Sequence, residues 1–201
     1  MNKRRLWSFN FTTATLVLIP AAIGINYIGK LFAERLGLPL WLDSIGTALA
    51  SMLSGPVVGA ISGAINNFIY GLTMNPISFV YALTSIAIGI TVGIMAYNGK
   101  INTLWKSIIA GVVVAIVAAI VSTPLNVIFW GGQTGNVWGD ALYAYLIAHA
   151  VPVWIASFLD EIVVDFPDKI ATMIIAFLIF KGLPRKLIPL YQSGETIEKL
   201  D

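Results

Sequence analysis

The sequence predicts an all-α membrane protein, with six transmembrane helices in a compact bundle, both termini in the cytoplasm and a long outer loop region before the last helix. Two observations predict this class. Of the 201 residues, 58% are hydrophobic and 11% are charged, whereas charged residues make up roughly a quarter of a soluble domain. At about 20 residues for each crossing, the chain has room for about six or seven spans. We therefore expect a single integral membrane domain over residues 1–201, with a polar cytoplasmic tail at 184–201.

Composition also excludes several function classes. The chain has no cysteine, which excludes disulfides, thiolate catalysis and cysteine metal sites. A net charge of +2 is too small to indicate nucleic-acid binding. No phosphate-binding loop, catalytic triad or zinc-binding His-Glu motif is present. The sequence therefore predicts a protein that is not an enzyme and uses no cofactor or metal, with an intramembrane hydrolase as the alternative.

The first span is expected at residues 9–28, where a long apolar run follows three basic residues. No small-residue cleavage site separates this run from the next segments, so we interpret it as a span and not as a cleaved signal. Pro20 should kink it. Residues 30–39 follow as an amphipathic connector with Gly and Pro stops.

The second and third spans are expected within residues 40–72, as two short apolar helices folded back at Ser54-Gly55-Pro56. Pro cannot donate an N–H inside a helix, and Gly tolerates the turn. A polar residue stands at each end of this hairpin, where hydrocarbon would penalise it unless it faced protein or water. These residues are Asp43, Asn66 and Asn67. The hairpin is therefore expected to line something polar.

Glycines at four-residue intervals indicate close helix packing, because they strip one helix face of side chains. One such series lies on the second helix of the hairpin, and a second pair lies on the span expected at residues 77–97. The expected helix-packing residues are Gly55, Gly59, Gly63, Gly89 and Gly93.

Two further spans are expected at residues 104–121 and 167–181. Pro124 should break the first, and Pro167 should open the second. Residues 131–166, between them, are too polar for one simple span and too apolar for a solvated loop. We expect short helices there that lie at the outer interface or dip into it, where Trp and Tyr are favoured. A seventh crossing within residues 143–158 is the alternative.

Basic residues predict the orientation, because cytoplasmic loops carry an excess of Lys and Arg. With six spans, one side of the membrane collects Lys3, Arg4, Arg5, Lys100, Lys106, Lys181, Arg185 and Lys186. The opposite side collects Asp43, Asp140, Asp160, Glu161, Asp165 and Asp168, together with most of the tryptophans. The basic side is therefore expected to be the cytoplasm.

The hairpin LDSIGTALASMLSGPVVGAISGAINN and the final span DFPDKIATMIIAFLIFK resemble the substrate-binding S component of an energy-coupling factor (ECF) transporter. The resemblance covers essentially the whole chain, and the hairpin also resembles the membrane sensor regions of some bacterial signalling proteins. It implies a multi-pass subunit of the bacterial cell membrane that binds a vitamin or vitamin precursor. Its partners would be a transmembrane coupling (T) subunit and two ABC ATPase subunits. The first span lacks the Ala-x-x-x-Ala by which many members contact the coupling subunit.

The densest polar group is residues 160–169, expected at the outer mouth of the last helix. Glu161, Asp165 and Lys169 recur every four residues, so on a helix they would share one face and point into a binding cavity. The alternative is structural, with Asp168 as a helix-start residue and Lys169 as an ion-pair partner or snorkelling side chain.

The other candidate binding residues are polar or aromatic and lie near expected helix ends. They are Trp41, Asp43, Asn67, Tyr70, Tyr81, Asn126, Trp130 and His149. Structural alternatives stay open for several: helix capping for Asp43, an interfacial aromatic belt for the tyrosines, and a satisfied structural role for His149, the single histidine.

The aromatic residues suit stacking on a flat heterocycle, and the acidic and amide groups suit hydroxyl and amine donors. The first expectation for the ligand is hydroxymethylpyrimidine or a pyridoxine-like compound, with cobalamin, riboflavin and pantothenate left open. The alternative functions are a membrane ligand sensor and an independent secondary carrier. An inverted internal repeat would favour the carrier, and none is convincing in this sequence.

Overall fold

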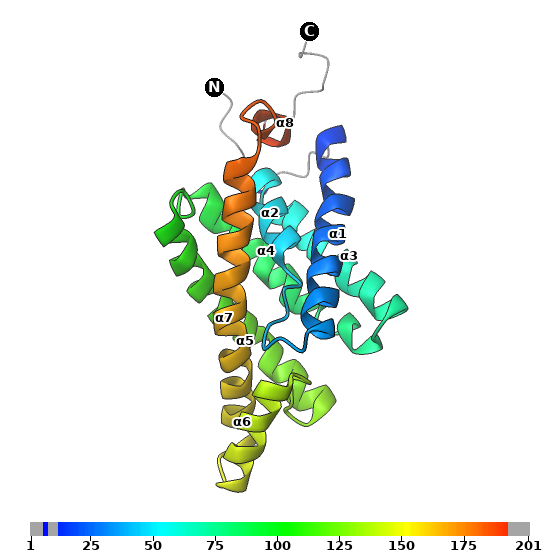
Figure 1. The fold of residues 1–201 in the computed structure, drawn as a ribbon, viewed down its shortest axis with the longest axis vertical. Helices are drawn as coiled ribbons and strands as arrows, with labels where there is room; N and C mark the ends of the chain where they lie inside the picture. Colours follow the sequence, from blue (N-terminus) through cyan, green and yellow to red (C-terminus); the bar gives the residue numbers. More distant parts are fainter. Residues whose placement is uncertain (1–5, 8–11, 193–201) are drawn as a thin grey trace.

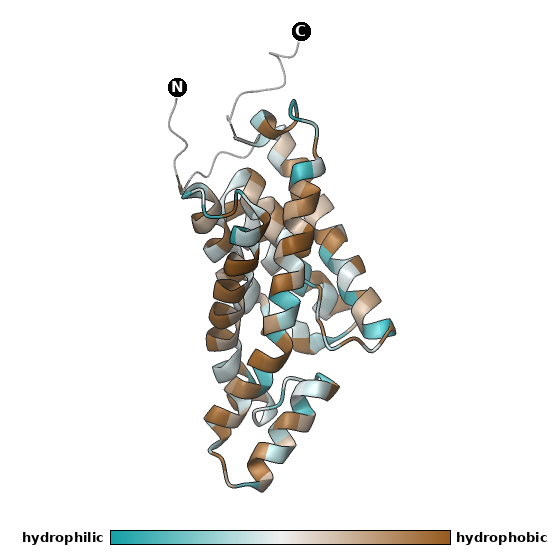
Figure 2. Ribbon diagram, turned by 60° about the vertical axis from the view of Figure 1, so that its left-hand side comes forward, coloured by the Kyte–Doolittle hydropathy of each residue, from teal (hydrophilic) through white to brown (hydrophobic). Residues whose placement is uncertain are grey.

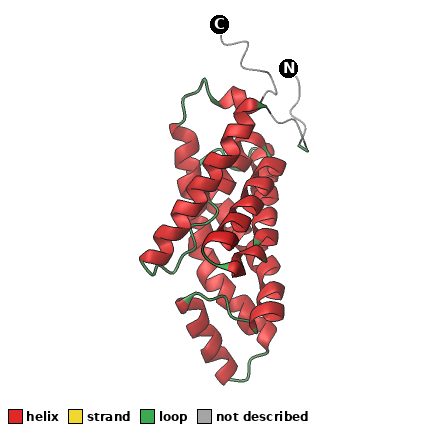
Figure 3. Ribbon diagram, turned by 90° about the vertical axis from the view of Figure 1, so that its right-hand side faces the viewer, coloured by secondary structure: helices red, strands yellow, loops and turns green. Residues whose placement is uncertain are grey.

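The computed structural model describes residues 6–7 and 12–192. The basic residues 3–5, the expected start of the first span at Phe9 and residues 193–201 of the tail lie outside the described residues. Within the described ranges the fold is all-helical, with helices α1 to α8, one short 3-10 helix and no strand (Figure 3). The all-α prediction is therefore confirmed for this part of the chain.

Thr12 is the N-cap of helix α1 (Thr13–Arg35), and its hydroxyl accepts a hydrogen bond from the backbone N–H of Thr15 at 3.2 Å. Pro20 lies inside the helix. The helix continues past residue 28, so the prediction that residues 30–35 form a connector was wrong. Two of their long polar side chains have partners elsewhere in the fold: Lys30 donates to Ser78 (Nζ to Oγ, 3.1 Å), and Glu34 accepts from the hydroxyl of Tyr70. The connector is limited to residues 36–44.

The expected hairpin is confirmed as α2 (Ile45–Ser54) and α3 (Pro56–Thr73), joined at Gly55 with φ +94°. Asp43 does not cap α2. The N-cap is Ser44, and the first amides of α2 are bound from another helix by Asn26 of α1. Its Oδ1 accepts N–H from Gly46 (2.6 Å) and Thr47 (3.2 Å), which anchors the hairpin to α1.

Four of the expected packing glycines lie where helices cross. A Cβ at Gly89 or Gly93 of α4 (Ala82–Tyr97) would overlap the backbone of α3, at Ala60 and Pro56 respectively. A Cβ at Gly59 would overlap Ser51 of α2, and one at Gly63 would lie 2.9 Å from Cβ of Ser85. Gly55 instead occupies the turn, where its positive φ favours glycine.

Two predicted breaks were wrong. Helix α5 (Leu104–Trp130) runs through Pro124 and ends at Gly131 (φ +70°), and α7 (Val153–Gly182) starts well before Pro167. In an apolar bundle an interrupted helix leaves backbone groups without water, so both helices continue through their prolines.

Residues 131–166 therefore hold a loop, the short helix α6 (Val137–Ala148) and the first half of α7. The short helix was expected; the continuous α7 was not. The 3-10 helix η1 (Pro76–Phe79) precedes α4, and α8 (Ile188–Gln192) follows α7. The start of α1 and α8 lie at one end of the molecule, and α6 lies at the other (Figure 1).

Helices α1 and α5 are long and apolar enough to cross a membrane, and α2 and α4 are shorter apolar helices. The count of six spans stays a prediction. Buried apolar side chains of α2, α4, α5 and α7 form the largest core cluster, around Met52, Val92, Val114 and Met173. Many large apolar side chains are exposed on the outside of the helices. Hydrophilic residues gather in the loops and near the middle of the bundle (Figure 2).

Candidate functional site

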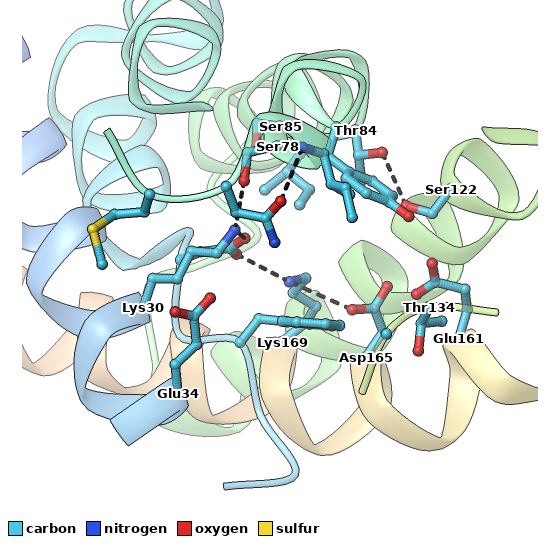
Figure 4. A pocket seen from close by; sticks show the side chains of 18 residues that line it. Lys30, Glu34, Ser78, Thr84, Ser85, Ser122, Thr134, Glu161, Asp165 and Lys169 are labelled. Atoms are coloured by element: carbon cyan, nitrogen blue, oxygen red, sulfur yellow. Dashed lines mark hydrogen bonds and ion pairs between the residues drawn. The ribbon is translucent and has the colours of Figure 1, made fainter. Parts of the chain in front are cut away.

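A cavity of about 400 Å³ lies between α1, the connector 36–44, η1, α4, α5, the loop after α5 and α7. Polar side chains from all of these elements line it (Figure 4). Six of the predicted site residues are on its wall: Trp41, Asp43, Tyr81, Glu161, Asp165 and Lys169. The sequence placed them at several helix ends, and the fold brings them together around one space.

Lys169 is the centre of a buried charge cluster on α7. Its ammonium group lies 2.6 Å from Asp168, 3.5 Å from Asp165 and 3.7 Å from Asp43, and its side chain is only 3% exposed. A buried ammonium is tolerated only when it is paired in this way. The two expected roles for Lys169, cavity residue and ion-pair partner, are thus compatible.

Asp43 joins this cluster to α1, because its carboxylate also lies 4.0 Å from Nζ of Lys30. Burial alone would raise the pKa of Asp43, but the ammonium groups of Lys169 and Lys30 outweigh burial and hold the pKa below its usual value. Asp43 is therefore ionised at neutral pH. Lys30 also lies over the ring of Tyr70, 4.4 Å from its centroid.

Asp168 is not a helix-start residue, which corrects the structural alternative considered from the sequence. It lies inside α7 and is fully buried. Its Oδ1 accepts backbone N–H groups from Trp41 (3.0 Å) and Leu42 (2.8 Å). This carboxylate therefore fastens the connector 36–44 against α7, with Trp41 at the cavity wall.

A second hydrogen-bonded chain crosses the other side of the cavity. The hydroxyl of Tyr81 donates to Oδ1 of Asn126, and Nδ2 of Asn126 donates to Oε1 of Glu161 at 2.6 Å. Asn126 is fully buried. The chain links the start of α4 to α5 and α7 and holds Glu161 at the wall.

The remaining predicted residues lie behind the wall or away from it. Asn67 donates to Ser85 Oγ at 2.6 Å, and Tyr70 donates to Glu34, so both support residues that line the cavity. Trp130 packs on Phe129, with ring centroids 6.1 Å apart, and does not line the cavity. His149 is the C-cap of α6, where its ring lies 4.2 Å from that of Tyr145, and it does not line the cavity.

Sequence reasoning missed several lining residues, including Lys30, Glu34, Ser78 and Thr134. Lys30 and Glu34 are one helical turn apart in a segment that was assigned to a connector. The spacing was a usable signal, because residues at i and i+4 share a helix face. Ser78 lies in the short helix η1 and Thr134 in the loop after α5, and no sequence pattern marks either residue.

The arrangement suits reversible binding of a polar solute. Carboxylates, ammonium groups, hydroxyls and two aromatic residues surround one space, so the lining offers many hydrogen-bond and charge partners to a small polar molecule. No group of three or more His, Cys, Asp or Glu side chains able to hold a metal occurs in the described part of the chain.

A family model described as "ECF transporter, substrate-specific component" matches residues 14–189. No curated protein and no solved structure matches the chain.

Proposed function

We propose that this chain, which belongs to the substrate-specific components of ECF transporters, captures a small water-soluble compound in the cavity beside α7. Members of this family are integral membrane subunits that bind substrate and associate with ECF T and ATPase subunits. They are transport subunits and not enzymes.

The observation that carries the proposal is a polar cavity inside a bundle with an apolar exterior. Asp165 and Lys169 are 4% and 3% exposed at their side chains, near the middle of α7. At about 1.5 Å per residue, this 30-residue helix is roughly 45 Å long, against about 30 Å for the hydrocarbon core. Ionisable groups at membrane depth are expensive and mark binding sites by default.

For the topology, we propose six spans formed by α1, α2, α3, α4, α5 and α7, with both termini in the cytoplasm and the chain as a single integral membrane domain. Lys100, Lys106 and Lys181 support this, since they lie at the ends of α4, α5 and α7 that the proposal assigns to the cytoplasm. The cavity would then open to the outside.

For the ligand, we propose a vitamin or vitamin precursor with one flat ring, such as hydroxymethylpyrimidine or a pyridoxine-like compound. A cavity of about 400 Å³ is at the small end of the range for ligand sites, which disfavours the much larger cobalamin. Trp41 and Tyr81 line it and suit ring stacking. Riboflavin and pantothenate are the other candidates.

The test is to purify the full chain in mild detergent, alone and with coexpressed coupling and ATPase subunits, and to identify copurifying small molecules by mass spectrometry. A stoichiometric vitamin-like compound, together with a stable complex, supports the proposal and names the ligand. A protein that is empty and binds none of these subunits would favour the ligand sensor or the independent carrier.

A further inference from the structure

We infer that the ligand is an organic cation whose protonated nitrogen binds Glu161. This inference rests on the proposed function, because it assigns a chemical class to the compound held in the same cavity. It follows from the balance of charges around the cavity and from which of those charges are already paired.

The two ammonium groups of the cavity are already neutralised by the protein. Lys169 lies within 4.0 Å of three carboxylates, those of Asp168, Asp165 and Asp43. Lys30 lies 4.0 Å from Asp43 and donates to Ser78 Oγ at 3.1 Å. Neither lysine therefore needs an anionic ligand to compensate its charge.

The acidic groups, in contrast, exceed the basic ones. The charged lining residues are two lysines, Lys30 and Lys169, and four acids, Glu34, Asp43, Glu161 and Asp165. Asp168, behind the wall, adds a fifth carboxylate to the same cluster. A cavity with this excess of negative charge favours a positively charged guest.

Among the buried acidic groups of the lining, Glu161 is the one without an ion pair to a described residue. It is 3% exposed, and in the part of the chain that the structure describes no Lys, Arg or His nitrogen lies within 4.0 Å of its carboxylate. Its partner is the neutral amide of Asn126, bonded to Oε1. Asp165, one helical turn away, adds a like charge. A carboxyl group buried in such a place is neutralised by its own proton while the cavity is empty, and a bound cation can take over that role.

The surroundings of Glu161 match a protonated ring or an aminomethyl group. Tyr81 lines the same cavity, and its hydroxyl is tied to Asn126, which also holds Glu161. Thr134 and Ser122 add hydroxyls to this side (Figure 4). A carboxylate beside an aromatic ring recognises an organic cation through a charge-assisted hydrogen bond and a cation–π contact.

The test uses matched pairs of probes on the full chain in detergent, with binding measured by calorimetry and thermal unfolding at neutral pH. Pyridoxamine is compared with pyridoxine, and 5-aminomethyl-2-methylpyrimidin-4-amine with its hydroxymethyl counterpart. Within a pair only the charged amine is exchanged for a hydroxyl. In at least one pair the amine should bind about tenfold tighter or better, as expected for an added buried charge pair.

Glu161→Gln keeps the shape and the acceptor oxygen for Asn126 but removes the charge, so it should reduce the preference for the amine to about threefold or less. Asp140→Asn is the matched control. Asp140 is outside the cavity lining and accepts N–H groups from Thr134 and Gly135, which an asparagine oxygen can still accept, so the preference should be retained.

Equal or tighter binding of the hydroxyl compounds overturns the inference, and so does the absence of binding by either amine at millimolar concentration. A neutral or anionic compound copurified from a complex with coupling and ATPase subunits would also overturn it, while leaving the proposed function intact. Failure to assemble with those subunits would count against the proposed function instead.

Discussion

Replacing Asp168 by alanine should release the connector 36–44 from α7. In the native protein Oδ1 of Asp168 accepts the N–H groups of Trp41 and Leu42, at 3.0 and 2.8 Å, and Oδ2 receives the ammonium group of Lys169 at 2.6 Å. Alanine removes all three contacts from a fully buried position. The connector is bound across a sequence separation of 126 to 127 residues, so no local interaction replaces them.

The expected loss follows from these groups. An unpartnered buried N–H costs about 1–3 kcal/mol, and the substitution leaves the N–H groups of Trp41 and Leu42 without their acceptor. Trp41 is only half-buried, so water can compensate in part. Lys169 keeps Asp165 and Asp43 as partners. Leu42, held at φ +49°, stores roughly 1–2 kcal/mol of backbone strain, which its release would recover. We expect a net loss of about 2–4 kcal/mol in unfolding free energy.

The assay is unfolding in mixed detergent micelles, combined with amide hydrogen exchange at residues 40–43. Asp168→Asn keeps an acceptor oxygen for the two amides and should lose less stability than alanine. Asp140→Ala is the matched control, because Asp140 also accepts two loop N–H groups, from Thr134 and Gly135 at 3.1 Å, but at a half-buried site. The loss of unfolding free energy in Asp140→Ala should stay at about 1 kcal/mol or below.

The reasoning is refuted if Asp168→Ala unfolds like Asp168→Asn and the amides of Trp41 and Leu42 exchange no faster. Faster exchange limited to the connector, without a change in the exchange of α5 or α7, would support it.

Three further predictions concern packing, binding and topology. Gly89→Ala should destabilise the bundle by about 1–3 kcal/mol, because the added methyl overlaps the backbone at Ala60. Gly24→Ala in α1 is the control and should be neutral or stabilising, because a Cβ there meets nothing within 4 Å. Equal thermal shifts for the two variants would contradict the packing argument. Asn126→Ala breaks the bridge between Tyr81 and Glu161, and Lys169→Ala leaves three carboxylates, those of Asp43, Asp165 and Asp168, without their shared cation. Each variant should weaken ligand binding by about tenfold or more, at roughly 1.4 kcal/mol for each factor of ten in Kd. Unchanged binding in ligand titrations of both variants would remove both residues from the site. The chain has no cysteine, so single cysteines can report the topology without a cysteine-free background having to be made. Gly99→Cys should react with a membrane-impermeant maleimide from the cytoplasmic side, and His149→Cys from the outer side. Labelling of both from one side would reject the six-span topology.

The sequence alone determined the features that depend on local spacing and composition. The turn at Gly55-Pro56 follows from the backbone limits of these two residues. The common face of Glu161, Asp165 and Lys169 follows from helical periodicity, and the structure places all three on the cavity wall. The family was also recognisable, since the resemblance in the hairpin and last span agrees with the matched family model.

The tertiary structure alone decided the features that depend on distant partners. Pro124 and Pro167 predict helix ends in water, but both lie inside helices, because an apolar bundle penalises an interrupted backbone more than a proline. Asp168 looked like a local helix start, and its partners are the amides of Trp41 and Leu42 on a remote connector. Lys30 and Glu34 entered the site because α1 continues to Arg35. Periodicity indicates which residues share a face, whereas the fold determines what that face meets.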